Sequence, residues 1–163
     1  MFDTNCFYQI ANGEIEILNL DDNEYFVTPI QKRELQEKEV NKKFSKDRKE
    51  RLLSTFNTID KRDKNLETGL LGHSEAGQLP MKLGTTGWYE KFRKDLDKFK
   101  KETNNIDDAL IAEVAITNEI ILVTNDKKLI DVVEVVKPSL IMSFEEFKKE
   151  FLKNEVKNKI QTN

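Results

Sequence analysis

An unbroken run of apolar and β-branched residues, Ile120–Thr124, constrains the fold of this chain more than any other feature. Such runs are typical of strands in the middle of a parallel sheet, because helices cover both faces of a central strand. Asn125 and Asp126 close the run. In open α/β folds, ligands bind at the carboxyl ends of the strands. The run therefore predicts an α/β domain with polar side chains gathered at one edge of its sheet.

Length and composition bound the class of protein. At 163 residues the chain is long enough for one ordinary domain. We expect that domain over residues 1–155, with a basic helical and glycine-rich insertion at about 36–104 and a frayed tail at 156–163. No segment approaches the roughly 20 apolar residues of a membrane span, and the first residues lack the basic stretch that opens a signal peptide.

The chain has one cysteine, Cys6. A single cysteine excludes an internal disulfide, and proteins without disulfides are typical of the cytosol, so we expect a cytoplasmic protein. Cys6 lies among apolar residues of a predicted strand without a nearby base, which favours a packed core thiol over a nucleophile.

Four carboxylates lie where predicted buried elements begin or end. The first, Asp3, falls within residues 1–7, which are typical of a short buried strand. A carboxylate in a buried strand is costly unless it is paired or bound to a metal. Residues 24–27 predict a second short strand.

The second carboxylate, Glu34, follows a helix start. Thr28 is a candidate capping hydroxyl, Pro29 suits the first helical position, and Gln31 lies three residues after the cap. Glu34 lies four residues after Ile30 and shares its helix face, which should point toward the sheet.

The third and fourth carboxylates flank the central run. A helix start at residues 104–108 leads into an apolar stripe, and Asp108 lies on the same side as that stripe. Asp107 points elsewhere and can cap the helix; the alternative makes both aspartates caps. Asp126 either faces the ligand edge of the sheet or caps the helix that follows.

The chain ends in a strand and a helix. Residues 140–142 predict the last strand. Ser143 and Glu146 form a capping box that opens a C-terminal helix through Phe147 and Phe151.

Lysine and arginine concentrate in three stretches despite a net charge of -3. Each stretch, taken alone, is typical of a solvated helix face with compensating acids. A phosphodiester substrate, in contrast, requires cations along its backbone. The candidates for such contacts are Lys32, Arg33, Lys91 and Arg93.

Four segments in order along the chain, MFDTNCF, VTPIQKREL, DDALIAEVAITNEIILVTND and SLIMSFEEF, resemble the PIN domain family of metal-dependent ribonucleases. The resemblance implies a three-layer α/β fold with a central, mostly parallel sheet flanked by helices. It covers the two ends of the chain and leaves the 36–104 insertion unaccounted for. It also implies a set of catalytic and metal-binding residues, Asp3, Glu34, Asp108 and Asp126, with Asn5 and Thr124 as supporting polar residues.

The donor set and the resemblance together define the expected activity. Oxygen donors without a histidine or cysteine cluster select Mg²⁺ or Mn²⁺ over zinc. The resemblance implies an endoribonuclease that cuts RNA with a metal-activated water and leaves a 5′-phosphate. The family includes the toxins of bacterial toxin–antitoxin pairs, so a cognate antitoxin protein is an implied partner. A homodimer is a second partner that the sequence leaves undecided.

Two other functions remain. A non-catalytic module of the same fold would use the basic helices to hold RNA or a protein, but buried unpaired acids are costly in a mere scaffold. An aspartyl-phosphate phosphatase would need a second carboxylate two positions after the first. This chain has Asn5 there, which disfavours the phosphatase.

Overall fold

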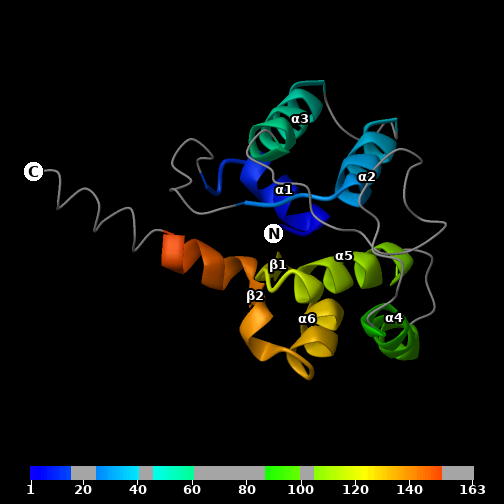
Figure 1. Ribbon diagram of the computed structural model, residues 1–163. Helices are drawn as coiled ribbons and strands as arrows, with labels where there is room; N and C mark the ends of the chain where they lie inside the picture. Colours follow the sequence, from blue (N-terminus) through cyan, green and yellow to red (C-terminus); the bar gives the residue numbers. More distant parts are fainter. Residues whose placement is uncertain (16–24, 41–45, 61–86, 100–104, 152–163) are drawn as a thin grey trace, which may run out of the picture.

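A computed structural model describes residues 1–15, 25–40, 46–60, 87–99 and 105–151 (Figure 1). The fold is mixed α/β and mostly helical, which confirms the predicted fold class at that level. In chain order its elements are α1 (Thr4–Ala11), α2 (Pro29–Val40), α3 (Lys46–Asp60), α4 (Trp88–Phe99), α5 (Asn105–Thr117), β1 (Leu122–Thr124), α6 (Lys127–Glu134), η2 (Pro138–Leu140) and β2 (Ile141–Ser143). Residues 144–151 add a further helix. Within these ranges, no helix has the length and apolar character needed to cross a membrane.

The sheet is small and parallel. Strands β1 and β2 pair in parallel over their full length, from Leu122 with Ile141 to Thr124 with Ser143. Phe2 forms a parallel bridge to Val123, supported by hydrogen bonds of 2.8 Å between the N-terminal segment and Val123. The apolar run is thus the central strand, as predicted, although only its last three residues are paired.

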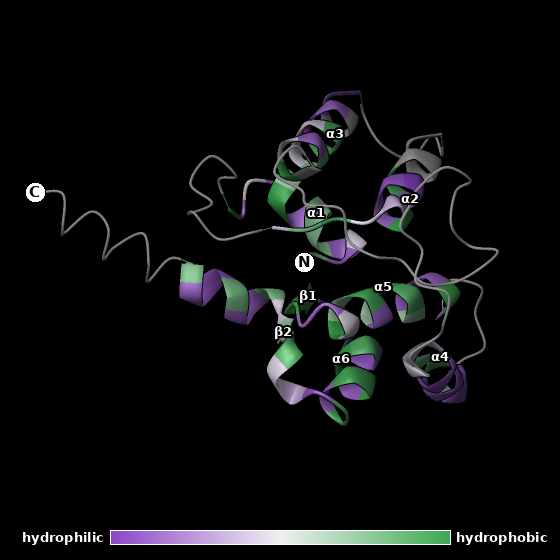
Figure 2. Ribbon diagram, viewed as in Figure 1, coloured by the Kyte–Doolittle hydropathy of each residue, from purple (hydrophilic) through white to green (hydrophobic). Residues whose placement is uncertain are grey.

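Helices cover both faces of this sheet. Successive side chains of a strand point to opposite faces; Leu122 lies in a core with α4, α5 and α6, and Val123 lies in a second core with α1, α3 and Phe144. Figure 1 shows β1 and β2 between these two groups of helices. Figure 2 shows α5 as hydrophobic along most of its length, in keeping with its position against the sheet.

The described parts of the 36–104 segment belong to the core. Phe56 and Ile59 of α3 are buried, and Phe56 lies 5.6 Å from Phe7 of α1, measured between ring centroids. From α4, Phe92 is fully buried and stacks on Trp88 at 5.9 Å. Residues 41–45, 61–86, 100–104 and the predicted tail lie outside the described residues.

Two predicted strands are wrong. The chain does not continue as a strand to residue 7, because Asp3 caps α1 and Thr4 already begins that helix. Cys6 is buried as predicted, but on a helix. Tyr25 and Val27 are buried without strand pairing. Tyr25 instead stacks on Phe2 at 5.7 Å, so their apolar pattern indicates burial only.

The predicted start of α2 is confirmed, with one correction. Gln31 Oε1 accepts a hydrogen bond from the Thr28 N–H at 2.5 Å, and Pro29 opens the helix. The Thr28 hydroxyl is buried and has no hydrogen-bond partner in the described part of the chain. The prediction of a capping hydroxyl is therefore wrong, and only the bond from the Thr28 N–H to Gln31 forms at this helix start.

The other helix starts follow the same pattern of partial agreement. Helix α5 begins at Asn105 and places Asp107 and Asp108 in its first turn, so neither aspartate is the cap. The capping box of Ser143 and Glu146 is confirmed, with Ser143 N–H donating to Glu146 Oε2 at 2.9 Å. Strand β2 begins one residue later than predicted.

Candidate metal centre

Asp3 lies where the N-terminal segment leaves the sheet and enters α1. Its side chain accepts a hydrogen bond from the Thr4 N–H at 2.6 Å, and only 4% of the residue is exposed. Burial is the main reason that the pKa of Asp3 rises to about 6. The charges of Glu34 and Asp126 add to the rise, while the hydrogen bond from Thr124 opposes it.

One hydroxyl joins the two strand ends at this point. Thr124 Oγ1 donates to Asp3 Oδ2 at 2.6 Å and accepts from Asn5 Nδ2 at 3.1 Å and from the Asp126 N–H at 3.0 Å. A hydroxyl has one donor and two acceptor positions, so Thr124 is fully used. Asn5 Nδ2 also donates to Asp3 Oδ2 at 2.5 Å. The two predicted supporting residues therefore hold the Asp3 carboxylate in one orientation.

Glu34 reaches the same place from α2. Thr4 Oγ1 donates to Glu34 Oε2, which ties the second carboxylate to the residue after the first. The helix itself is held by Gln31, which is fully buried and donates to the carbonyl of Phe2. Thr4 is not among the predicted site residues, and its signal in the sequence is a hydroxyl directly after Asp3. For Gln31 the sequence predicts only a capping role.

Asp108 completes the set from the first turn of α5. Burial is the largest reason that its pKa rises to about 8, and the charges of Asp3, Asp126 and Glu34 follow in that order. The charge of one carboxylate raises the pKa of another in this way only when the two lie close together. The four predicted acids are therefore neighbours in space, although α1, α2, α5 and α6 bring them from distant parts of the chain.

Of the two roles predicted for Asp126, the structure confirms the helix cap. Asp126 caps α6, with Oδ1 accepting from the Lys128 N–H at 2.8 Å and from the Leu129 N–H at 3.3 Å. Its charge also raises the pKa values of Asp3 and Asp108. Both capping bonds use Oδ1.

The four acids bring like charges together when they are ionised. None of the ion pairs among the described residues involves any of the four acids. Within the same residues, no three or more His, Cys, Asp or Glu side chains already stand in the arrangement of a metal site. Ionised carboxylates repel one another, and protonation or a bound cation relieves that repulsion. The all-oxygen donor set suits a hard divalent ion.

The predicted nucleic-acid contacts are mostly paired with acids. Arg33 makes an ion pair of 2.7 Å with Asp107. On α4, Lys91 pairs with Asp95 at 3.1 Å and Arg93 pairs with Asp97 at 3.2 Å. Such pairs are what a solvated helix face with compensating acids would show. Lys32 is exposed.

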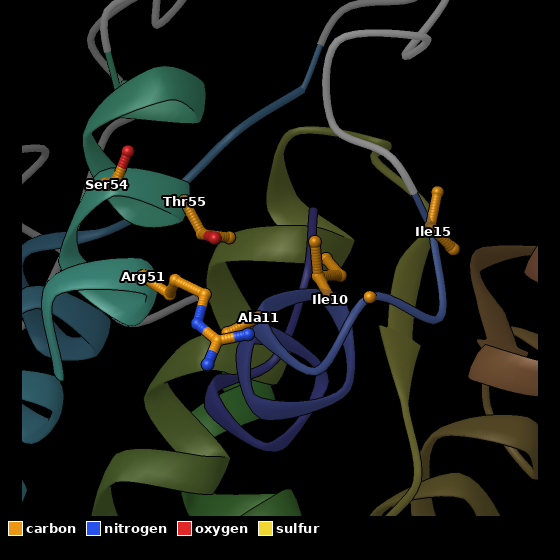
Figure 3. A pocket seen from close by; sticks show the side chains of 7 residues that line it. Ile10, Ala11, Ile15, Arg51, Ser54 and Thr55 are labelled. Carbon is orange, nitrogen blue, oxygen red and sulfur yellow. The ribbon is translucent and has the colours of Figure 1, made fainter. Parts of the chain in front are cut away.

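A separate pocket of about 270 Å³ lies between α1 and α3 (Figure 3). Arg51 extends from α3 toward Ala11 at the end of α1, with Ile10 beside it. The full lining is Ile10, Ala11, Gly13, Ile15, Arg51, Ser54 and Thr55. None of the four acids lines this pocket, so it is distinct from the candidate metal centre.

No protein-family model, curated sequence or solved structure matches the chain. The function considered below therefore rests on the residues of the candidate centre and on the resemblance of their motifs.

Proposed function

We propose that this protein is a Mg²⁺- or Mn²⁺-dependent endoribonuclease with a PIN-like, three-layer fold, and that Asp3, Glu34, Asp108 and Asp126 hold the metal. One observation carries the proposal. Four carboxylates from separate elements lie close enough that, after burial, which is the largest cause, the charges of Asp3, Asp126 and Glu34 help to raise the pKa of Asp108 to about 8. Parallel pairing around β1 and helices on both of its faces support the PIN-like fold.

The chain's own residues would prepare the site. Thr124 and Asn5 fix the orientation of Asp3, and Thr4 fixes Glu34. Such outer partners orient metal ligands and strengthen them. When bound, the divalent ion would supply a water nucleophile and stabilise the leaving oxygen of the phosphodiester. Asp108 must release its proton before it can act as a ligand, so we expect activity to rise with pH toward about 8.

The direct test is cleavage of a mixed panel of structured and single-stranded RNAs in Mn²⁺, with EDTA as the blank. Asp108→Asn keeps the size of the side chain and removes its charge. We expect a loss greater than the roughly 10–100-fold that an outer partner costs a metal site. Asp131→Asn, an exposed change on α6, is the matched control. Cleavage that survives EDTA or Asp108→Asn would refute the proposal.

The second candidate is a non-catalytic module that binds RNA or protein. It is favoured by one observation, that the acids do not already stand in a metal-site arrangement. A metal that binds the folded chain raises its melting temperature, whereas a scaffold is indifferent to Mn²⁺. A melting temperature unchanged by Mn²⁺, together with no RNA cleavage, would select the module.

A further inference from the structure

We propose that the ion pair between Arg33 and Asp107 is a clamp that positions the metal-binding acids. The inference rests on the proposed function and adds two positioning residues to it. Arg33 directly precedes Glu34 in α2, and Asp107 directly precedes Asp108 in α5. The pair spans 74 positions of the chain and joins Arg33 Nη2 to Asp107 Oδ1 at 2.7 Å.

The need for a clamp follows from the charges. Glu34 and Asp108 repel each other when both are ionised. This repulsion favours separation of α2 from α5. An attraction between the neighbouring residues opposes this separation and acts on the backbone one residue away from each acid.

The ion pair is better explained by a role in positioning the metal-binding acids than by a contribution to folding stability. The side chain of Arg33 is 40% exposed and that of Asp107 is 21% exposed, and ion pairs this exposed contribute little to folding. A guanidinium holds a carboxylate in a defined geometry that an ammonium does not reproduce. We therefore expect the pair to act on the site more than on the fold.

The rival role for Arg33 is direct contact with an RNA phosphate, and Asp107 separates the two roles. If Arg33 bound phosphate, removal of the charge of Asp107 would remove a competing anion and leave RNA binding unchanged or stronger. If the pair is a clamp, loss of either partner weakens the metal site. The two accounts therefore predict opposite effects of Asp107→Asn.

The experiment compares the full-length variants Arg33→Gln, Asp107→Asn and their double mutant. For each single variant we expect the Mn²⁺ concentration for half-maximal RNA cleavage to rise about tenfold, the loss typical of an outer partner of a metal site. The double mutant should lose no more than either single variant, because both remove the same interaction. The KM for RNA should change little.

Two further variants control for unfolding and for a general effect of losing an ion pair. The exchanged pair, Arg33→Asp with Asp107→Arg, should recover most of the lost Mn²⁺ affinity, which a merely unfolded variant cannot do. Lys148→Gln breaks an ion pair of 3.2 Å with Glu14, neither partner of which is next to one of the four acids in the sequence, and should leave the Mn²⁺ requirement unchanged.

The outcomes separate the clamp from the proposed function. A wild-type protein that cleaves RNA, with both single variants equally active, would overturn the clamp alone. A higher KM for RNA in Arg33→Gln, with no loss of activity in Asp107→Asn, would also overturn the clamp. It would mean that Arg33 contacts RNA. A wild-type protein without Mn²⁺-dependent cleavage or melting shift would overturn both proposals.

Discussion

At the scale of single residues, two carboxyl groups govern how the metal-free protein responds to pH. The pKa of Asp3 is raised to about 6 and that of Asp108 to about 8, whereas both titrate near 4 in an unfolded chain. Between these values the folded chain binds more protons than the unfolded chain, so the free energy of unfolding falls as pH rises. The contribution of Asp3 is lost by about pH 6 and that of Asp108 by about pH 8.

Asp108→Asn tests this directly, because asparagine stays neutral. In EDTA at about pH 8 the variant should be more stable than the wild type, with a free energy of unfolding higher by up to about 5 kcal/mol. Below about pH 4 the difference should disappear, because Asp108 is then protonated in both the folded and the unfolded wild type. Melting curves at the two pH values give the answer, and a variant that is less stable at the higher pH would contradict a strained acid cluster.

Thr124→Val removes the hydroxyl at the centre of the site and keeps its shape. Asp3 loses a donor and Asn5 loses an acceptor, so RNA cleavage should fall about 10–100-fold and the free energy of unfolding by about 1–3 kcal/mol. Thr117→Val is the matched control, because the Thr117 hydroxyl is buried with no hydrogen-bond partner among the described residues. Equal effects of the two substitutions would mean that the Thr124 network has no special role.

At the scale of elements, α2 depends on one buried amide. Gln31 donates to the carbonyl of Phe2 and accepts from the Thr28 N–H. Gln31→Leu should leave both backbone groups unsatisfied and cost about 1–3 kcal/mol each. Thr28→Val, which removes a hydroxyl without a described partner, should be neutral or stabilising. Chemical denaturation measures both, and a harmless Gln31→Leu would contradict this account of how α2 is attached.

Local signals predicted those elements whose ends are encoded in neighbouring residues. The Ser143 and Glu146 capping box and the Pro29 start of α2 are both confirmed. The prediction of a strand over residues 1–7 is wrong because Asp3 both ends the strand segment and caps α1. An apolar pattern alone does not distinguish the first turn of a buried helix from a strand.

The candidate site was predictable only in part. The four acids were identifiable from their places at element ends, and the structure brings them together. The partners Thr4 and Asp107 were not identifiable, because Thr4 binds Glu34 across 30 positions and Arg33 binds Asp107 across 74. Contacts of that range depend on how the helices pack, which no local pattern in one sequence reports.

At the scale of the whole molecule, α3 is part of the core. Phe56→Ala should cost about 3–5 kcal/mol, because Phe56 is 2% exposed and lies against Phe7. Phe99→Ala, at a position that is 53% exposed, should change stability by no more than about 0.5 kcal/mol. Urea unfolding compares them, and a mild effect of Phe56→Ala would mean that α3 projects from the domain as an insertion.

The central claim is that four distant acids form one divalent-metal site. Calorimetric titration of the purified protein with Mn²⁺, at about pH 8 where Asp108 can ionise, tests it most directly. We predict binding to the wild type, weakened at least about tenfold in Asp3→Asn, Glu34→Gln, Asp108→Asn and Asp126→Asn and unchanged in Asp131→Asn. Absence of binding to the wild type, or equal binding by all four variants, would contradict the claim.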